Sequence, residues 1–275
     1  MPRMFATLAS DTTWFVKSLF NKKDLVAELA KRELKTKYTG SYLGPAWLFL
    51  EPICFICILW FVFTIGLRGS GAVEDAPFIV FLSTGIVCWQ YFSENFNANT
   101  VLVKQYSFLL TKTDVALSIL PIVKITSSLV AHGALIFFVV IIAAVNKIYP
   151  SFYLLQIFYY TGAMMVLLLG LGWLTSALNV FVNDVAKIVK VLVQFGFWLT
   201  PILWNYEMVG PEYLPIFKMN PMFYIIQGYR DSIFNAIGFW EKPIWGLYYW
   251  AVTGFILLFG AIVFKRLRPH FAAVV

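Results

Sequence analysis

The chain alternates long apolar runs with short polar breaks, and most of the runs have the length of a membrane-spanning helix. A helical crossing needs roughly 20 mostly apolar residues. Such runs can be placed at residues 46–67, 77–92, 120–145, 152–178, 185–204 and 243–264. The pattern therefore predicts an all-α integral membrane protein with six transmembrane helices, forming one membrane domain over residues 46–264.

The segment before the first run, residues 1–45, is the most polar part of the chain and carries a helical apolar stripe. Val26, Ala30, Leu34 and Tyr38 recur at the spacing of one helical face. Cations occupy the other side of the same predicted helix: Lys23, Lys31, Arg32, Lys35 and Lys37. A helix of this kind lies along a membrane surface, so we expect a cytoplasmic amphipathic interface helix here.

The connection between the last two runs, residues 205–242, is too polar to cross a membrane and too apolar for a free loop. Asn220 and Pro221 match an N-cap and a first helical position. Apolar residues then recur at helical spacing: Met222, Ile225, Ile226, Tyr229 and Ile233. This segment is expected to form short re-entrant or interfacial helices on the outer side of the membrane.

Lysine and arginine are distributed unevenly about the predicted crossings. With the N-terminus inside, 15 cations fall on the cytoplasmic side, including those of the basic tail 265–275. Five fall outside: Arg68, Lys147, Lys218, Arg230 and Lys242. Cytoplasmic loops carry such an excess, so both termini are expected in the cytoplasm. Lys124 lies inside the third crossing near its cytoplasmic end, where its long side chain can reach the interface.

Composition supports the membrane assignment. Of the 275 residues, 60% are hydrophobic and 13% are charged, whereas soluble domains are about 45–50% apolar and about 25% charged. The net charge of +7 is explained mainly by the excess of cations on one side. It does not indicate a nucleic-acid partner.

Motifs for nucleotide, metal or hydrolytic chemistry are missing from the sequence. No G-x-x-x-x-G-K-[ST] string is present, so the chain cannot form a P-loop by itself. His132 and His270 are the only histidines, so neither a metal site nor a Ser/His/Asp set is expected. The three cysteines lie in apolar runs and are interpreted as small core residues.

Two ionisable residues lie inside predicted crossings, where such residues are functional candidates by default. Glu51, near the start of the first crossing, has either an entrance or gating role or pairs with a neighbouring helix. For His132, near the middle of the third crossing, an interhelical hydrogen bond is the favoured interpretation.

Aromatic residues are abundant: 10 Trp, 14 Tyr and 27 Phe. Aromatic belts at the two membrane interfaces account for most of them. Trp60, Trp89, Phe195 and Trp198 include residues placed deeper than the belts. Flat aromatic faces can pack against the apolar C–H faces of sugar rings, so these residues are candidates for a substrate path, with ordinary packing as the alternative.

Ordered motifs along nearly the whole chain carry a family resemblance. They are Glu33-Leu34-Lys35-Thr36-Lys37-Tyr38, Ser41-x-Leu43-Gly44-x-x-Trp47, Glu51-Pro52, Trp60-Phe61-Val62-Phe63, Gly85 with Trp89, Phe92 and Ser93, Asn183-Asp184, Phe197-Trp198-Leu199-Thr200-Pro201-Ile202, Asn220-Pro221 with Tyr229-Arg230, and Arg266-Leu267-Arg268-Pro269-His270-Phe271-Ala272. Together they resemble the membrane permease subunit of bacterial polysaccharide ABC exporters, which move O-antigen, teichoic acid or capsule chains. One departure is the stretch Leu110-Thr111-Lys112-Thr113-Asp114, where the family often has an aromatic-Pro-x-Glu element.

The resemblance implies a homodimer of six-span subunits with two copies of a cytoplasmic ATPase, which would hold the ATP and Mg; no cofactor is expected on this chain. A coupling segment at about 95–118 would contact the ATPase through Ser107, Leu110, Lys112 and Asp114. Crossings one and five would line the conduit, with six residues as path candidates: Glu51, Trp60, Phe63, Trp89, Phe195 and Trp198. Arg32, Lys35, Lys37 and Tyr38 could meet a lipid diphosphate, although cytoplasmic charge bias and anionic lipid attraction explain these cations equally well.

The function implied is that of a permease in an ATP-driven exporter of polyprenyl-diphosphate-linked polysaccharide, across the bacterial cytoplasmic membrane. O-antigen is the first expectation, and teichoic acid or capsule the second. A hydroxyl-covered polymer cannot enter hydrocarbon without losing hydrogen bonds, so a protein-lined path is needed. The alternatives are export of a drug or small lipid, an intramembrane transferase using Glu51 and His132, and a structural scaffold.

Overall fold

The computed structural model describes residues 42–66, 72–73, 76–106 and 116–274, together with Glu28, Lys31 and Glu33. Three predicted features therefore lie wholly or mostly outside the described residues. They are the amphipathic helix with Arg32, Lys35, Lys37 and Tyr38, the coupling residues Ser107, Leu110, Lys112 and Asp114, and the loop after the first crossing.

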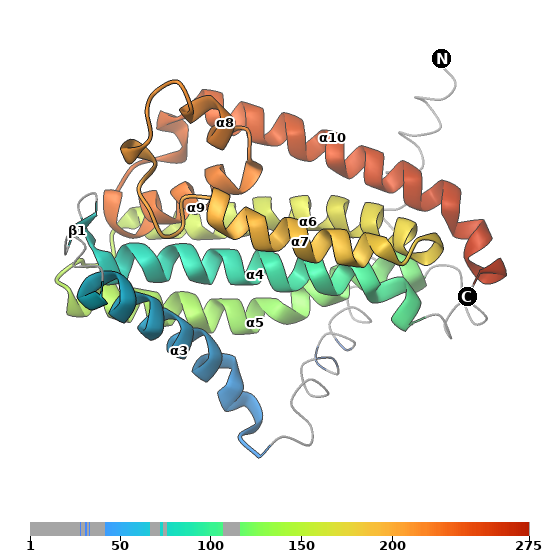
Figure 1. Ribbon diagram of the computed structural model, residues 1–275, viewed down its shortest axis with the longest axis horizontal. Helices are drawn as coiled ribbons and strands as arrows, with labels where there is room; N and C mark the ends of the chain where they lie inside the picture. The colour runs from blue at the N-terminus through green and yellow to red at the C-terminus, as the bar shows by residue number, and fades with distance from the viewer. Residues whose placement is uncertain are drawn as a thin grey trace.

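Long helices make up most of the described chain. They are α3 (Trp47–Phe61), α4 (Phe78–Gln105), α5 (Ala116–Val145), α6 (Gln156–Phe181), α7 (Asp184–Leu199) and α10 (Pro243–Leu267). Figure 1 shows α4, α5, α6, α7 and α10 running along the long axis of the molecule, whereas α3 diverges from this bundle. Consecutive long helices run in alternate directions, as short connections require.

Shorter elements join these helices. They are η1 (Gly44–Ala46), the π-helical turn η2 (Val62–Gly66), η4 (Phe152–Leu155), η5 (Tyr206–Met208), α8 (Leu214–Lys218), α9 (Pro221–Arg230), the π-helical turn η6 (Asp231–Asn235), η7 (Phe239–Glu241) and η8 (Arg268–Ala273). A short antiparallel pair, β1 (Ala72–Val73) with β2 (Ala76–Pro77), precedes α4.

The helical class is confirmed, and part of the span prediction is supported. Within the described residues, four helical stretches are long and apolar enough to cross a membrane: Trp47–Gly66, Leu117–Val145, Phe152–Phe181 and Pro243–Phe271. α4 is long but carries many polar residues in its second half and is not one of these four, and α7 has only 16 residues. The count of six crossings stays a prediction.

α4 is the central helix of the bundle and contacts α3, α5, α6, α7 and α9. It continues to Gln105, so the expected end of the second crossing, near residue 92, lies within this helix, and the point where the crossing ends stays a prediction. The polar residues of its second half bond within the protein: the Asn95 amide and the Thr100 hydroxyl donate to backbone carbonyls one turn earlier. Ser128 of α5 also donates to Asn95, and Thr100 bonds Thr175 of α6. These partners let a polar helix run through the centre of the bundle.

The outer segment contains the predicted helix start, but its helix is more deeply buried than expected. The Asn220 side chain accepts a hydrogen bond from the Met222 backbone N–H, and Pro221 is the first helical residue. Every residue of α9 from Met222 to Arg230 is buried, so this helix packs inside the protein rather than exposing one polar face. Arg230, assigned above to the outer surface, is fully buried over the Phe81 ring.

Basic residues gather at one end of the bundle. Lys104 lies in the last turn of α4, Lys187 and Lys190 lie in the first half of α7, and Lys265 and Arg266 lie in the last turn of α10. These helix ends lie together at the right of Figure 1. The arrangement brings the predicted cytoplasmic cations of the described residues to one side of the molecule.

Glycines set the closest helix–helix approach, between α6 and α10. A Cβ at Gly170 would lie 2.7 Å from the Leu257 Cα, and one at Gly260 would lie 2.3 Å from the Gly170 carbonyl oxygen. Small residues permit such backbone contact between membrane helices. Gly172 lies similarly against Asn99 of α4, whereas a Cβ at Gly162 would meet nothing within 4 Å.

The substitution Gly170→Ala is expected to destabilise the bundle by about 1–3 kcal/mol, because α6 and α10 would have to separate. Gly162→Ala, on the same helix in open space, is the matched control and should be neutral or stabilising by roughly 0.5–1 kcal/mol. Thermal unfolding of the purified variants in detergent would measure both. Equal melting temperatures for the two variants would contradict this account of the crossing.

Candidate functional site

The exposed face of α7 combines polar and aromatic side chains. Lys187, Lys190, Gln194 and Trp198 are spaced so that they share one helical face, and all four are exposed. Trp198 is 58% exposed, and the neighbouring Phe195 is 62% exposed. We refer to Lys187, Lys190, Gln194, Phe195 and Trp198 as the α7 stripe.

The opposite face of α7 fixes the helix to α4. Val189 is the buried residue of this helix, and Gly196 lies against Trp89 so closely that a Cβ there would come 2.8 Å from the indole ring. Trp89 is 7% exposed and packs against Phe92 and Phe197. The structure therefore places Trp89 in the α4–α7 contact, beneath the α7 stripe.

The polar members of the α7 stripe cannot face hydrocarbon at low cost. An amide without a hydrogen-bond partner costs several kcal/mol in an apolar medium, and intramembrane charges nearly always face a protein interior or a water-filled cavity. Lys187 bonds Asp184 at the exposed start of the helix, but Gln194 lies two turns further on. This side of α7 fits a wet, protein-lined path better than a lipid contact.

α3 supplies the other predicted path residues and is loosely packed. Only Pro52 and Ile56 of this helix are buried. Trp60 is 36% exposed, and Phe63 packs against Phe78 of α4 with ring centroids 5.9 Å apart. Phe55 approaches Phe197 of α7, at 6.1 Å between centroids. This one ring contact joins the two predicted path helices.

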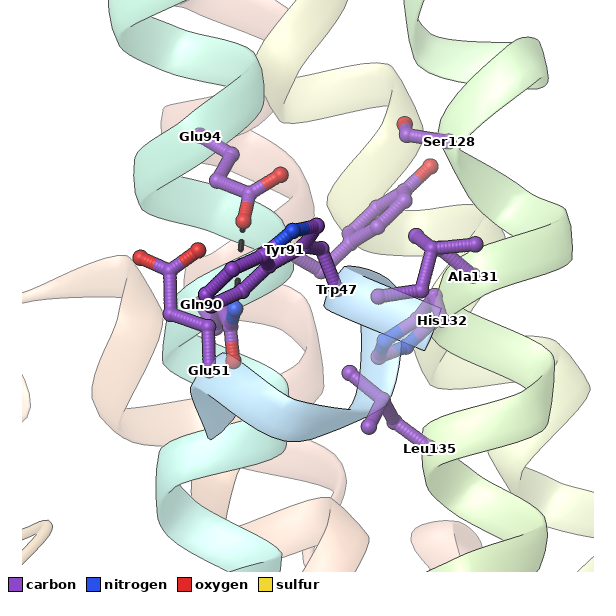
Figure 2. Close-up of a pocket in the computed structure, with 10 residues that line it drawn as sticks. Trp47, Glu51, Gln90, Tyr91, Glu94, Ser128, Ala131, His132 and Leu135 are labelled. Carbon is purple, nitrogen blue, oxygen red and sulfur yellow. Dashed lines mark hydrogen bonds between the residues drawn. The ribbon is translucent and has the colours of Figure 1, made fainter. Parts of the chain in front are cut away.

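A small polar pocket lies where the start of α3 meets α4 and α5. Its volume is about 80 Å³, enough for about two or three water molecules at ~30 Å³ each. Glu51 of α3 and Glu94 of α4 lie on one side, and His132 of α5 lies on the other (Figure 2). Gln90 donates to the Glu94 carboxylate at 3.1 Å. Among the described residues, no lysine, arginine or histidine nitrogen lies within 4 Å of the Glu51 carboxylate.

His132 forms the interhelical hydrogen bond expected of it. Its Nε2 lies 2.8 Å from the Tyr229 hydroxyl of α9, and that hydroxyl lies 2.6 Å from the Thr161 hydroxyl of α6. The imidazole also stacks on Tyr91, with ring centroids 4.3 Å apart. This chain of groups joins α5, α9 and α6, which indicates a structural role for His132 in the subunit.

One point of the predicted amphipathic helix is described. Glu33 accepts hydrogen bonds from Lys124 of α5 at 2.6 Å and from the Tyr106 hydroxyl after α4 at 3.1 Å. Lys124, expected to extend to the interface, is instead paired with this carboxylate. The bond ties the N-terminal segment to the basic end of the bundle.

Sequence reasoning missed the polar half of the α7 stripe and the α4 side of the pocket. The spacing of Lys187, Lys190 and Gln194 was a readable signal, since it repeats at helical intervals. The sequence could not show that Gln90 and Glu94 lie near Glu51, because this proximity depends on how α3 crosses α4. Among the described residues, no group of three or more His, Cys, Asp or Glu side chains could hold a metal ion.

Comparisons with known proteins identify relatives over nearly the whole chain. A family model described as ABC-2 type transporter matches residues 24–234. The chain is 26% identical to the O-antigen export system permease protein RfbA of Klebsiella pneumoniae, over 91% of this chain and 95% of that protein. It is 24% identical to the RfbA protein of Myxococcus xanthus, over 94% and 97% of the two chains. It is 20% identical to the polysialic acid transport protein KpsM of Escherichia coli, over 90% and 95%.

The α7 stripe predicts a difference in solvent access between two faces of one helix. In a background with Cys54 and Cys57 replaced by serine, Gln194→Cys is expected to react with a charged, membrane-impermeant thiol reagent. Leu192→Cys, which is also exposed but lies about 160° around the helix from Gln194, is the control. The Gln194→Cys site should react more than about tenfold faster, because only the thiolate reacts and it does not form in hydrocarbon. Equal rates in native membranes would show that the stripe does not face water.

Proposed function

Because the chain belongs to the ABC-2 type transporter family, we propose that it is the permease of an ATP-driven exporter of polyprenyl-diphosphate-linked polysaccharide. It is an integral membrane transport component without an ATPase site of its own. The observation that carries the proposal is the similarity, over about nine-tenths of the chain, to permeases named for polysaccharide export. The proposed location is the bacterial cytoplasmic membrane, with both termini inside.

O-antigen is the first proposed cargo. The two relatives named for O-antigen export are 26% and 24% identical to the chain, against 20% for the relative named for polysialic acid. A capsule-type polymer is the second candidate, supported by that last relative, and teichoic acid is a further one. All three are hydroxyl-rich chains, so the α7 stripe suits each of them chemically.

The proposed path runs along α7 and α3, between two copies of the subunit. Within one subunit, the pocket beside Glu51 is about 80 Å³, far below the ~300–1,000 Å³ of ordinary ligand sites. The exposed faces of α3 and α7 are apolar and aromatic as well as polar, and the Phe55–Phe197 ring contact joins the two helices. Pairing these faces of two subunits in a homodimer would enclose a path lined by protein on all sides.

In this path, the polar and the aromatic side chains of the α7 stripe would make different contacts with a sugar chain. Gln194 and the lysines can exchange hydrogen bonds with hydroxyl groups, replacing those lost from water. Trp198 and Phe195 present flat faces to the C–H faces of sugar rings. Neither contact depends on the identity of one particular sugar, which fits a path that a long polymer slides through.

Energy for transport is proposed to come from a separate ATPase with its ATP and Mg, bound in two copies at the basic end of the bundle. This end carries Lys104 and the junctions between α4 and α5 and between α6 and α7. Glu33, tied to Lys124 and Tyr106, lies between this end and the N-terminal segment. A displacement of the α4–α5 junction by the ATPase would therefore reach the N-terminal segment directly.

Purification of the tagged chain from its native membrane in mild detergent tests the ATPase partner. A P-loop ATPase is expected to co-purify in equal amount. Deleting the gene should leave lipid-linked glycan inside the cell, and analysis of its sugars would separate O-antigen from capsule or teichoic acid. A chain that purifies alone, even after crosslinking, would contradict the exporter proposal.

The aromatic part of the α7 stripe can be tested by export itself. Trp198→Ala is expected to slow the appearance of polymer at the cell surface about two- to tenfold, since one aromatic contact is worth about 0.5–1.5 kcal/mol. Leu192→Ala, also exposed but on the other face of α7, should export at the normal rate. The proposed path would be excluded if both variants matched the unmodified protein at equal abundance in the membrane.

A further inference from the structure

A separate groove lies at the outer end of the molecule, between α8, α9 and the first turns of α10. Its volume is about 340 Å³, within the range of roughly 300–1,000 Å³ found for ligand sites. Phe223, Tyr224, Ile244, Trp245 and Tyr248 are among the residues that line it. Lys218, the last residue of α8, brings a positive charge to the same groove.

Trp245 lies beneath two lysines that differ in their pairing. Lys218 Nζ lies 4.6 Å from the centroid of the Trp245 ring, and Lys242 Nζ lies 5.3 Å from it. Lys242 is bonded to the buried Asp231 carboxylate. Among the described residues, no carboxylate lies within 4 Å of Lys218 Nζ. One of the two charges is therefore balanced by the protein, and the other remains for an anion.

The groove lies at the boundary of a candidate membrane span. The span Pro243–Phe271 begins with the residues that form one wall of the groove. From there an exposed apolar stripe continues along α10: Ile244 is 78% exposed, Leu247 74% and Phe255 68%. A phospholipid has a complementary arrangement of groups. Its phosphate would meet the single cation at the headgroup level, and its acyl chain would lie along the apolar surface of the helix.

The polar groups around the groove are poorly suited to a sugar. The Asn220 side chain already accepts a hydrogen bond from the Met222 N–H and donates one to the Thr200 hydroxyl. The Tyr248 hydroxyl donates to the Met219 carbonyl, and the Tyr224 hydroxyl bonds Tyr159. A sugar in this groove would bury several hydroxyls against carbon, at a cost of a few kcal/mol for each lost hydrogen bond. An acyl chain carries no such penalty.

We propose that this groove binds an anionic phospholipid of the outer leaflet, with the lipid phosphate at Lys218 and an acyl chain over Trp245, Ile244 and Tyr248. The bound lipid would join α8 to α10 and so stabilise the outer segment at the exit side of the subunit. The proposal does not depend on the transported substrate, since it concerns a surface away from the α7 stripe.

The test uses the purified, delipidated full chain in detergent, with phosphatidylglycerol as the probe and thermal stability and native mass spectrometry as the readouts. Phosphatidylglycerol is expected to raise the melting temperature and to appear as a bound adduct. Lys218→Gln should weaken its binding about fivefold, because a lysine near an anionic headgroup contributes about 1 kcal/mol. Lys147→Gln, at the same end of the bundle but outside the groove, is the control and should bind as the unmodified chain does.

A second variant tests the groove without changing Lys218. Ile244→Glu places a like charge at the mouth of the groove on an exposed position, so it should fold normally and lose the phosphatidylglycerol effect. Three results would overturn the proposal: an equal response of the Lys218 and Lys147 variants, equal protection by inorganic phosphate alone, or a loss of dimer in Ile244→Glu without any change in lipid binding. The last result would assign the groove to a second copy of the chain.

Discussion

A hydrogen-bonding side chain cannot face hydrocarbon without a partner, and this constraint determines where each helix lies. α4 carries Asn95, Asn99 and Thr100 and takes the centre, enclosed by five other helices. α3 is apolar apart from Glu51, so it can diverge from the bundle with little polar surface to satisfy. α7 differs from both of these helices. It buries one apolar side against the bundle and leaves the side chains of Lys190 and Gln194 exposed. A membrane protein can keep such a face only beside water or another polar surface.

The same need of polar side chains for hydrogen-bond partners determines how the outer segment packs. α9 is short and buried, so its polar side chains need partners from several helices at once. Tyr229 bridges His132 and Thr161, and Arg230 donates to the Ile202 carbonyl while its guanidinium lies over Phe81, 3.4 Å from the ring centroid. These contacts join α9 to α4, α5 and α6, and they also fix the turn after α7. The end of the candidate path is thus attached to the rigid centre of the bundle.

The sequence predicts most of the helices because apolar length is a local property. It also predicts the start of α9, since the N-cap at Asn220 uses only neighbouring atoms. The sequence did not show that α4 continues beyond residue 92, because the partners of Asn95 and Thr100, which are Ser128 and Thr175, come from other helices. The burial of Arg230 was missed for the same reason, as its partners Phe81 and Ile202 come from other parts of the chain. Interhelical pairing is the information that periodicity does not contain.

A path for a polymer requires more space than either pocket described above provides, at about 80 and 340 Å³. α6 and α10 approach until glycine backbones touch, and α4 fills the middle, so the closely packed side of the molecule leaves no room. α3 and α7 are packed less tightly, since α3 buries two residues and α7 one. Separating α3 from α7 would break few contacts, chiefly the approach of Phe55 to Phe197, while the α4–α6–α10 core stayed intact. If two copies pair as proposed, a closely packed core with a weakly attached α3 would let the subunit open along the proposed path.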